Sequence, residues 1–261
     1  MIKKVICALL AGAFALSLCS CNLPFGGTGG GSSSEVQDAT EEATKYSTNV
    51  DDYVYAEIKY NLPYSGDFQI TGEEDLKLQK ASSRMPQLSM NSADAKAIND
   101  DIHNKYQSLF DTMAELKDGT AVSRTDYVAY LNDNILSLVI ETRTVDSPSS
   151  GFNVYNINVE TGQRLSSDEV VALSNIDTEK AQSGVKAAMT AEYDKIKEVT
   201  GVDNEAVKTA ENKSLTDDNL AKTVYYFDKS RKLTSVYTFY QVAGAETTGK
   251  IQTLDAVKTR G

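Results

Sequence analysis

The segment at residues 122–159, VSRTDYVAYLNDNILSLVIETRTVDSPSSGFNVYNINV, decides the fold. It contains three runs rich in β-branched and aromatic residues, which favour strands. Asn132-Asp133-Asn134 separates the first two runs, and Pro148 and Gly151 lie between the second and the third, as is typical of turns. The pattern predicts three consecutive antiparallel strands, at residues 122–131, 135–145 and 152–159.

Helices are expected on both sides of this segment. In residues 92–116, apolar side chains recur every three or four positions, Ser92 offers an N-cap, and Gly119 offers a stop. Similar signals predict helices at 166–173 and 177–200, whereas 203–221 has a weak pattern that suggests helical turns and a loop. Further strands are expected at 53–62, 66–70, 84–90, 223–227, 233–242 and 250–254.

The order of these elements predicts an α+β fold class. Strands, a helix, three strands, helices and a hairpin follow one another, which favours an antiparallel sheet with helices packed on one face. Pro86 excludes residues 84–90 from the centre of a sheet. The pattern also allows two half-domains, at 53–120 and 121–261.

The amino end has the features of a lipoprotein export signal. Lys3 and Lys4 precede an apolar stretch at 5–18, which is too short to span a bilayer and typical of a signal peptide. Leu18-Cys19-Ser20-Cys21 then resembles a lipobox, which predicts cleavage after residue 20 and acylation of Cys21. The alternative is an ordinary secretory signal with incidental cysteines.

A flexible tether is expected between this signal and the folded part. Residues 26–34, GGTGGGSSS, cannot bury apolar area, and 35–52 continues with small and acidic residues. A tether at residues 21–52 would have a reach of about 30 Å. The sequence therefore predicts a domain attached to the outer, extracytoplasmic face of the cell membrane.

Composition limits the classes of function. The 261 residues carry a net charge of −11, and loss of Lys3 and Lys4 with the signal leaves 24 basic and 37 acidic residues, a net charge of −13. Such a charge repels phosphate backbones and argues against nucleic acid as a partner. The three cysteines are Cys7, Cys19 and Cys21, so the folded part has no thiol for a disulfide or a metal.

Three motifs resemble the extracellular domain family of RsiV, the lysozyme-sensing anti-sigma factor, which also occurs beside peptidoglycan deacetylase domains. ILSLVIE (135–141) and YNINVETGQRL (155–165) are similar to two strand motifs of that family. MPQL (85–88), followed by Ile98-Asn99, is similar to its preceding half. Residues 147–151 stand where the family has a "GaHg" segment. The resemblance implies the ectodomain fold over about 53–257, and lysozyme-like or cell-wall partners.

No motif in the sequence points to catalysis. His103 is the single histidine, and its nearest acidic neighbour at helical spacing is Asp100, an ordinary pairing on a helix surface. The acid clusters at 73–75, 100–101 and 217–218 lack the spacing of a calcium loop. Walker, dinucleotide and nucleophile-elbow motifs are absent from the sequence. We therefore expect no enzyme activity, no metal and no cofactor.

Tyrosine is the remaining candidate for binding. The chain has 14 tyrosines and no tryptophan. Tyr225, Tyr226 and Tyr237 lie on expected strands, where an exposed ring would anchor a protein or stack on a sugar; half-buried strand tyrosines are the alternative. The sequence predicts a membrane-tethered, non-enzymatic binding module for a lysozyme-like protein or peptidoglycan. The alternatives are an envelope enzyme or accessory to a cell-wall hydrolase or deacetylase, and a structural spacer.

Overall fold

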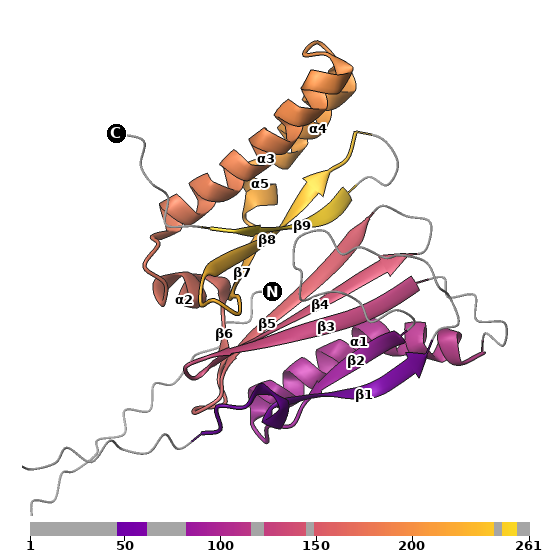
Figure 1. The fold of residues 1–261 in the computed structure, drawn as a ribbon, viewed down its shortest axis with the longest axis vertical. Coiled ribbons are helices and arrows are strands. Elements are labelled where there is room, and N and C mark those ends of the chain that lie inside the picture. The colour runs from indigo at the N-terminus through magenta and orange to yellow at the C-terminus, as the bar shows by residue number, and fades with distance from the viewer. Residues whose placement is uncertain (1–45, 62–81, 116–122, 145–148, 243–246, 255–261) are drawn as a thin grey trace, which may run out of the picture. The chain divides into compact units, whose positions relative to one another are not determined.

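The computed structural model describes residues 46–61, 82–115, 123–144, 149–242 and 247–254, all within one compact unit at 43–261 (Figure 1). Cys21, the tether up to residue 45 and the strand expected at 66–70 lie outside the described residues. Among the helices that the structure describes, none is long and apolar enough to cross a membrane.

The three consecutive strands predicted from 122–159 are present. β3 (Ser123–Asn132), β4 (Ile135–Thr144) and β5 (Ser150–Asn158) pair antiparallel in this order, and the short β6 (Arg164–Leu165) extends the sheet. Asp133 turns the first hairpin with a positive φ of 52°, a conformation that aspartate tolerates better than most residues. The turn sets the register by pairing Asn132 with Ile135.

A second antiparallel sheet forms from the carboxyl end of the chain. β7 (Val224–Phe227), β8 (Leu233–Tyr240) and β9 (Thr247–Thr253) lie in this order. The loop between β7 and β8 is held by Asp228, whose Oδ1 accepts hydrogen bonds from the backbone N–H groups of Ser230 and Lys232. The expected hairpin is confirmed, and β9 begins earlier than expected.

The first two strands form a pair beside β3. β1 (Val54–Asn61) pairs antiparallel with β2 (Ser82–Leu88), and Pro86 lies opposite Ala56 next to a shift of register. Ser83 Oγ donates to the carbonyl of Thr125 (2.9 Å) and accepts from its N–H (3.0 Å), so a side chain joins β2 to β3. The place of Pro86 beside an irregular pairing agrees with its lack of an N–H donor.

Five α-helices in the described part of the chain follow from capping and periodicity. Ser92 Oγ accepts from the N–H of Ala95 (3.1 Å) at the start of α1, and Ser166 and Glu169 form a capping box at the start of α2. Residues 203–221, where the pattern was weak, form α4 and α5. The helices are α1 (Ala93–Glu115), α2 (Ser167–Ala172), α3 (Thr178–Thr200), α4 (Glu205–Ser214) and α5 (Asp217–Leu220).

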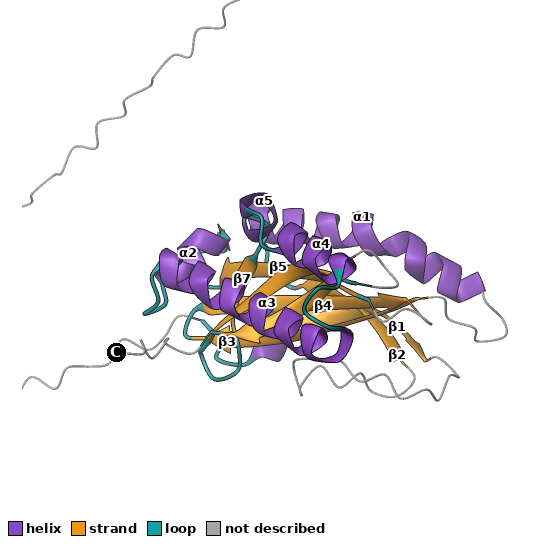
Figure 2. Cartoon of the chain, turned by 90° about the horizontal axis from the view of Figure 1, so that it is seen from above, coloured by secondary structure: helices purple, strands orange, loops and turns teal. Residues whose placement is uncertain are grey.

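The α+β class is confirmed, and the structure adds that the antiparallel strands are divided between stacked sheets with helices on opposite sides. One face of β4 and β5 packs on α1, through residues such as Leu138 and Ile102. The other face packs through Val139 on Val236 of the second sheet. The outer face of that second sheet is covered by α3, as Figures 1 and 2 show. Two sheets therefore stack between helices on opposite sides.

The expected boundaries between the tether and the folded part, at 52/53, and between the two half-domains, at 120/121, also need correction. Tyr53 Oη donates to the carbonyl of Ser47 (3.0 Å), and Tyr46 and Val50 pack on the core, so the folded part begins before residue 53. The core around α1 is shared with β4 and β5, which belong to the expected second half. A cut at 120/121 would divide one continuous core, so the halves are not separate domains.

Candidate functional site

The three tyrosines proposed as anchors are buried. Tyr225, Tyr226 and Tyr237 are 6%, 0% and 3% exposed. Tyr226 stacks on Tyr130, with ring centroids 6.3 Å apart, while the other two belong to the core beneath α3. Burial raises the pKa of Tyr225 and Tyr237 to about 12. The expectation of an exposed anchor is wrong at these positions, because both faces of the second sheet are covered.

His103 has an acidic partner that the sequence did not indicate. Its Nε2 lies 2.9 Å from Oε2 of Glu57, which joins α1 to β1. Both side chains are partly exposed. The pair tethers the surface of α1 to β1, and the expected neighbour Asp100 forms no part of it.

The acid clusters do not assemble a site in the part of the chain that the structure describes. Asp101 accepts hydrogen bonds from Lys105 Nζ and Tyr155 Oη, each 2.7 Å long, and so fastens α1 to β5. Asp217 and Asp218 begin α5, whereas residues 73–75 lie outside the described residues. Among the described residues, no three His, Cys, Asp or Glu side chains come together as metal ligands.

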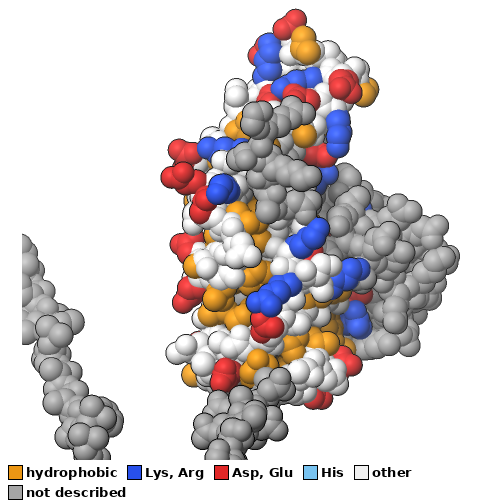
Figure 3. Space-filling view, turned by 60° about the vertical axis from the view of Figure 1, so that its left-hand side comes forward, with side chains coloured by type: hydrophobic (Ala, Val, Ile, Leu, Met, Phe, Trp, Pro, Cys, Tyr) orange, Lys and Arg blue, Asp and Glu red, His pale blue; other side chains and the backbone are white. Residues whose placement is uncertain are grey.

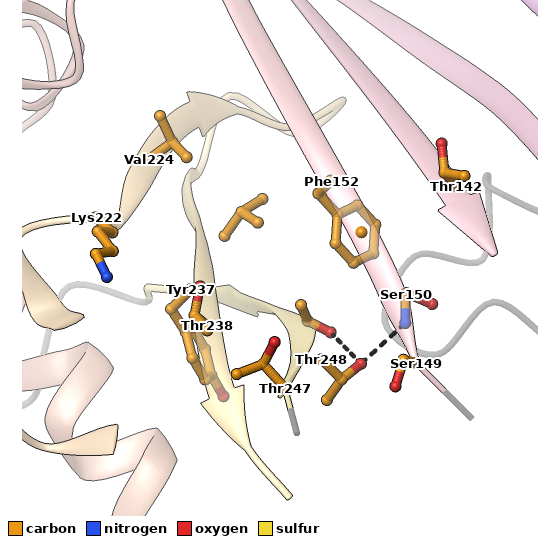
Figure 4. Close-up of a pocket in the computed structure, with 13 residues that line it drawn as sticks. Thr142, Ser149, Ser150, Phe152, Lys222, Val224, Tyr237, Thr238, Thr247 and Thr248 are labelled. Atoms are coloured by element: carbon orange, nitrogen blue, oxygen red, sulfur yellow. Dashed lines mark hydrogen bonds between the residues drawn. The ribbon is translucent and has the colours of Figure 1, made fainter. Parts of the chain in front are cut away.

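The structure instead has an open cleft of about 480 Å³ between the two sheets (Figure 4). The start of β5 forms one wall, and the start of β9, the middle of β8 and the residues before β7 form the other. Its size falls within the range of about 300–1,000 Å³ that is usual for small-molecule sites. The lining residues are Thr142, Ser149, Ser150, Gly151, Phe152, Lys222, Val224, Val236, Tyr237, Thr238, Thr247, Thr248 and Gly249.

Hydroxyl groups and aromatic rings dominate this lining. Two serines and four threonines contribute hydroxyls, and Phe152 lies across the cleft from Tyr237 and Lys222 (Figure 4). Lys222 carries the one charged side chain among the lining residues, all of which are described. The lining therefore suits a ligand that forms many hydrogen bonds and carries little charge.

Gly249 allows β9 to approach β5 closely. A Cβ at this position would lie 2.4 Å from Cδ2 of Phe152 and 3.0 Å from the carbonyl oxygen of Ser150. Thr248 Oγ1 accepts a hydrogen bond from the N–H of Ser150 (3.0 Å) and donates to the carbonyl of Gly249 (3.3 Å). The two sheets thus meet at the cleft through the hydroxyl of Thr248 and the ring of Phe152.

A buried carboxyl group lies behind the β5 wall. Glu141 on β4 is 3% exposed, and its Oε1 accepts a 2.5 Å hydrogen bond from Ser150 Oγ. Its Oε2 has no hydrogen-bond partner among the described residues. Burial raises the pKa of Glu141, although the hydrogen bond from Ser150 and the charge of Arg143 oppose this.

A second buried acid, Asp126, lies beside Glu141 on the neighbouring strand. Asp126 lies opposite Glu141 in the register of β3 and β4, and Arg84 approaches its Oδ1 at 2.6 Å. Burial raises the pKa of Asp126 despite this arginine. Since both acids have arginine neighbours, the group has the composition of a buried ion-pair network, which also perturbs pKa values.

Comparison with models of protein families gives no match for this chain, and comparison with curated proteins gives none either. The similarity to the RsiV domain family therefore remains a prediction from three sequence motifs.

The cleft was missed by sequence reasoning because its walls are distant along the chain. Ser150 and Thr248, which join them, are 98 positions apart. Phe152 and Val236 lie within expected strands, and Lys222 lies between the weakly patterned segment 203–221 and the strand expected at 223–227. The one local signal of the cleft was Gly249 in β9, because glycine inside a strand often marks a close approach of another backbone.

Proposed function

We propose that this chain is an exported lipoprotein whose folded part is a non-enzymatic binding module of the cell envelope. The proposal rests first on the lipobox at 18–21 and on the glycine- and serine-rich run that follows it. Acylation of Cys21 would hold the protein at the extracytoplasmic face, because two acyl chains give stable anchoring. The tether would let the folded part meet partners beyond the lipid headgroups.

The cleft is the single observation that supports binding most directly. Its described lining offers hydroxyls, the ring of Phe152 and one ammonium group, and contains no histidine, cysteine or carboxylate. Such groups orient and hold a ligand, and they include no carboxylate pair of the kind that glycoside hydrolysis uses.

Two partners fit the envelope location. Peptidoglycan suits the hydroxyl-rich cleft, and a basic lysozyme-like protein suits the net charge of −13. On the face shown in Figure 3, acidic side chains gather along the left edge, and several basic side chains lie over the middle.

Anchoring is tested by the variant Cys21→Ser in the full chain. We expect the variant to carry no acyl group, so that the chain moves from the membrane fraction to the soluble fraction once its signal peptide is removed by another signal peptidase. Cys19→Ser is the matched control, and it should remain membrane-bound. A Cys21→Ser protein that is still lipidated and sediments with the membrane would disprove the anchor.

An envelope enzyme or an accessory to one is the second candidate. Two buried acids with raised pKa values near a cleft favour it. It predicts release of reducing ends or acetate from peptidoglycan incubated with the purified protein, and loss of that release in Glu141→Gln. Absence of any product, with binding retained, would leave the binding module as the function.

A further inference from the structure

We propose that the cleft between β5 and β9 holds one or two sugar units of a glycan, and that Lys222 selects a unit that carries a carboxylate. This inference rests on the proposed function, since it names the ligand class of that same cleft. The shape of the cleft, the placement of its ring and hydroxyls, and its single charge support this ligand class.

The shape favours a small, extended ligand. A protein partner in a stable complex contacts about 20–30 residues of each surface, whereas thirteen residues line this cleft. The cleft is partly open, so one part of a longer chain can lie inside it while the rest extends into solvent. A polymer of repeating small units fits this geometry better than a folded protein does.

The distribution of polar and apolar groups matches a sugar. A pyranose ring has apolar C–H faces and a rim of hydroxyls, so it needs a flat apolar surface together with donors and acceptors around it. Phe152 offers the flat surface, and the threonines of β8 and β9 stand on the facing wall (Figure 4).

The walls are preorganised for such a ligand. Phe152 is fixed against Gly249, where the backbone leaves no room for a Cβ. Ser150 is held by two hydrogen bonds: its backbone N–H donates to Thr248, and its hydroxyl donates to Glu141. Ser149 Oγ accepts from Nε2 of Gln241 (3.0 Å). Groups already held in place lose little entropy on binding, which favours affinity.

Lys222 adds selectivity for one negative charge. It lies on the opposite wall from Phe152, and the described lining contains no acid that would compete for it (Figure 4). One ammonium group is too little for a polyphosphate in a chain of this net charge, but it matches a single carboxylate. N-acetylmuramic acid carries such a group on its lactyl ether, whereas N-acetylglucosamine does not.

The experiment compares two disaccharides that differ in this carboxylate. The mature full-length chain carrying Cys21→Ser is titrated with N-acetylglucosaminyl-N-acetylmuramic acid and with chitobiose, and binding is followed by calorimetry and by NMR shifts. We expect both sugars to bind at millimolar concentration or below, with the acidic disaccharide about tenfold tighter, as one charge pair allows.

Two variants separate the roles of the charge and of the hydroxyls. Lys222→Gln should remove the tenfold preference by weakening the acidic disaccharide, whereas Lys186→Gln, at an exposed lysine on α3, should leave the preference intact. Thr247→Val, at an exposed lining position, should weaken both sugars by about threefold to tenfold.

The outcomes decide between the inference and the wider proposal. If neither disaccharide shifts the signals of the cleft residues while the protein is folded, the inference is wrong, even though anchoring through Cys21 stands. Equal binding of both sugars that Lys222→Gln does not alter overturns the assigned role of Lys222. Binding of lysozyme but of neither sugar also overturns the inference and supports the protein partner.

Discussion

Gly249 controls how close the two sheets come at the cleft. Its Cα faces the ring of Phe152 and the carbonyl of Ser150, and the missing Cβ leaves the space that both occupy. For Gly151, on the opposite strand, the nearest atom of the described residues to an added Cβ is the carbonyl oxygen of Thr142, at 3.9 Å. The same substitution at these two positions therefore has different consequences.

We expect Gly249→Ala to lower the free energy of unfolding by about 1–3 kcal/mol, because the methyl group overpacks the contact with Phe152. Gly151→Ala is the control, with an expected change below about 0.5 kcal/mol. Denaturant titration measures both. Equal stability of the two variants would mean that the sheets separate easily at this point.

Glu141 should make stability depend on pH in an unusual direction. Burial raises its pKa in the folded protein above the ordinary value of 4.5. The folded state then holds the proton more tightly than the unfolded state, so the stability contributed by protonated Glu141 is lost as pH rises from that value through the folded pKa. The substitution Glu141→Gln keeps the shape of the side chain and replaces the carboxyl group by an amide that cannot ionise.

We therefore predict that Glu141→Gln is more stable than the parent chain at pH 7, and that the difference disappears toward pH 4. Thermal unfolding over this pH range measures it. Glu198→Gln, an exposed glutamate on α3, controls for the loss of one negative charge. A difference that is constant with pH, or that grows as pH falls, would contradict the prediction.

Single residues illustrate where sequence reasoning fails. Tyr225 and Tyr226 are neighbours on β7, so their side chains point to opposite sides of the strand, and they belong to different core clusters. The error lay in assuming that one side is exposed. Strand alternation predicts the side on which a residue lies, but what covers that side is decided by residues far away in the sequence.

At the level of elements, the sequence predicted most of what formed. The helices expected at 92–116 and 177–200 are Ala93–Glu115 and Thr178–Thr200, because a single apolar stripe and a cap define each end. α4 and α5 lie where helical turns and a loop were expected, and their short, polar pattern did not define their bounds. The second sheet was recognised as a hairpin, but nothing in its own residues showed that it stacks on the first sheet.

One signal of that stacking was present in β4. Its residues Ile135–Ile140 are all buried, and they read as a nearly continuous apolar run rather than an alternating one. Continuous runs are typical of strands that are covered on both faces. This run therefore indicated a layer on each side of the sheet, which the interpretation as one sheet with helices on one face did not use.

Tyr193 connects three elements of the outer layer. It lies on α3, and its hydroxyl bonds Ser214 Oγ of α4 (2.7 Å) and the carbonyl of Tyr240 of β8 (2.5 Å). Its ring stacks on Phe239, with centroids 4.4 Å apart, and the side chain is fully buried. Removing the hydroxyl leaves the stacking intact but leaves buried polar atoms without this partner.

We expect Tyr193→Phe to destabilise the fold by about 1–3 kcal/mol, the cost of leaving buried hydrogen-bonding groups unsatisfied. Tyr55→Phe makes the same chemical change at a 45% exposed position of β1 and should cost less than about 0.5 kcal/mol. Hydrogen exchange of amides in α4 reports the local effect. Unchanged exchange there would show that the hydroxyl does not hold α4 to α3.

For the whole molecule, charge is the property that acts over the longest range. The mature chain would carry −13, spread over a chain attached by one end to a membrane. Such a charge draws basic proteins toward it, and the gain in encounter rate shrinks when salt shortens the electrostatic range to about 8 Å. The same charge also keeps any envelope protein soluble, so its presence alone does not identify a partner.

The charge can attract a basic partner or only keep the protein soluble. Measuring association with lysozyme at two salt concentrations distinguishes these two roles. If lysozyme is a partner, the mature chain should bind it more tightly than an unrelated protein of equal charge does, and its association rate should fall by about tenfold from low to physiological salt. The equally acidic control sets the level that charge alone explains. Because the cleft is too small for a protein, lysozyme binding should persist when the cleft is saturated with disaccharide. Affinity no higher than that of the control would mean that the charge only confers solubility, and that the resemblance to a lysozyme sensor does not extend to its partner.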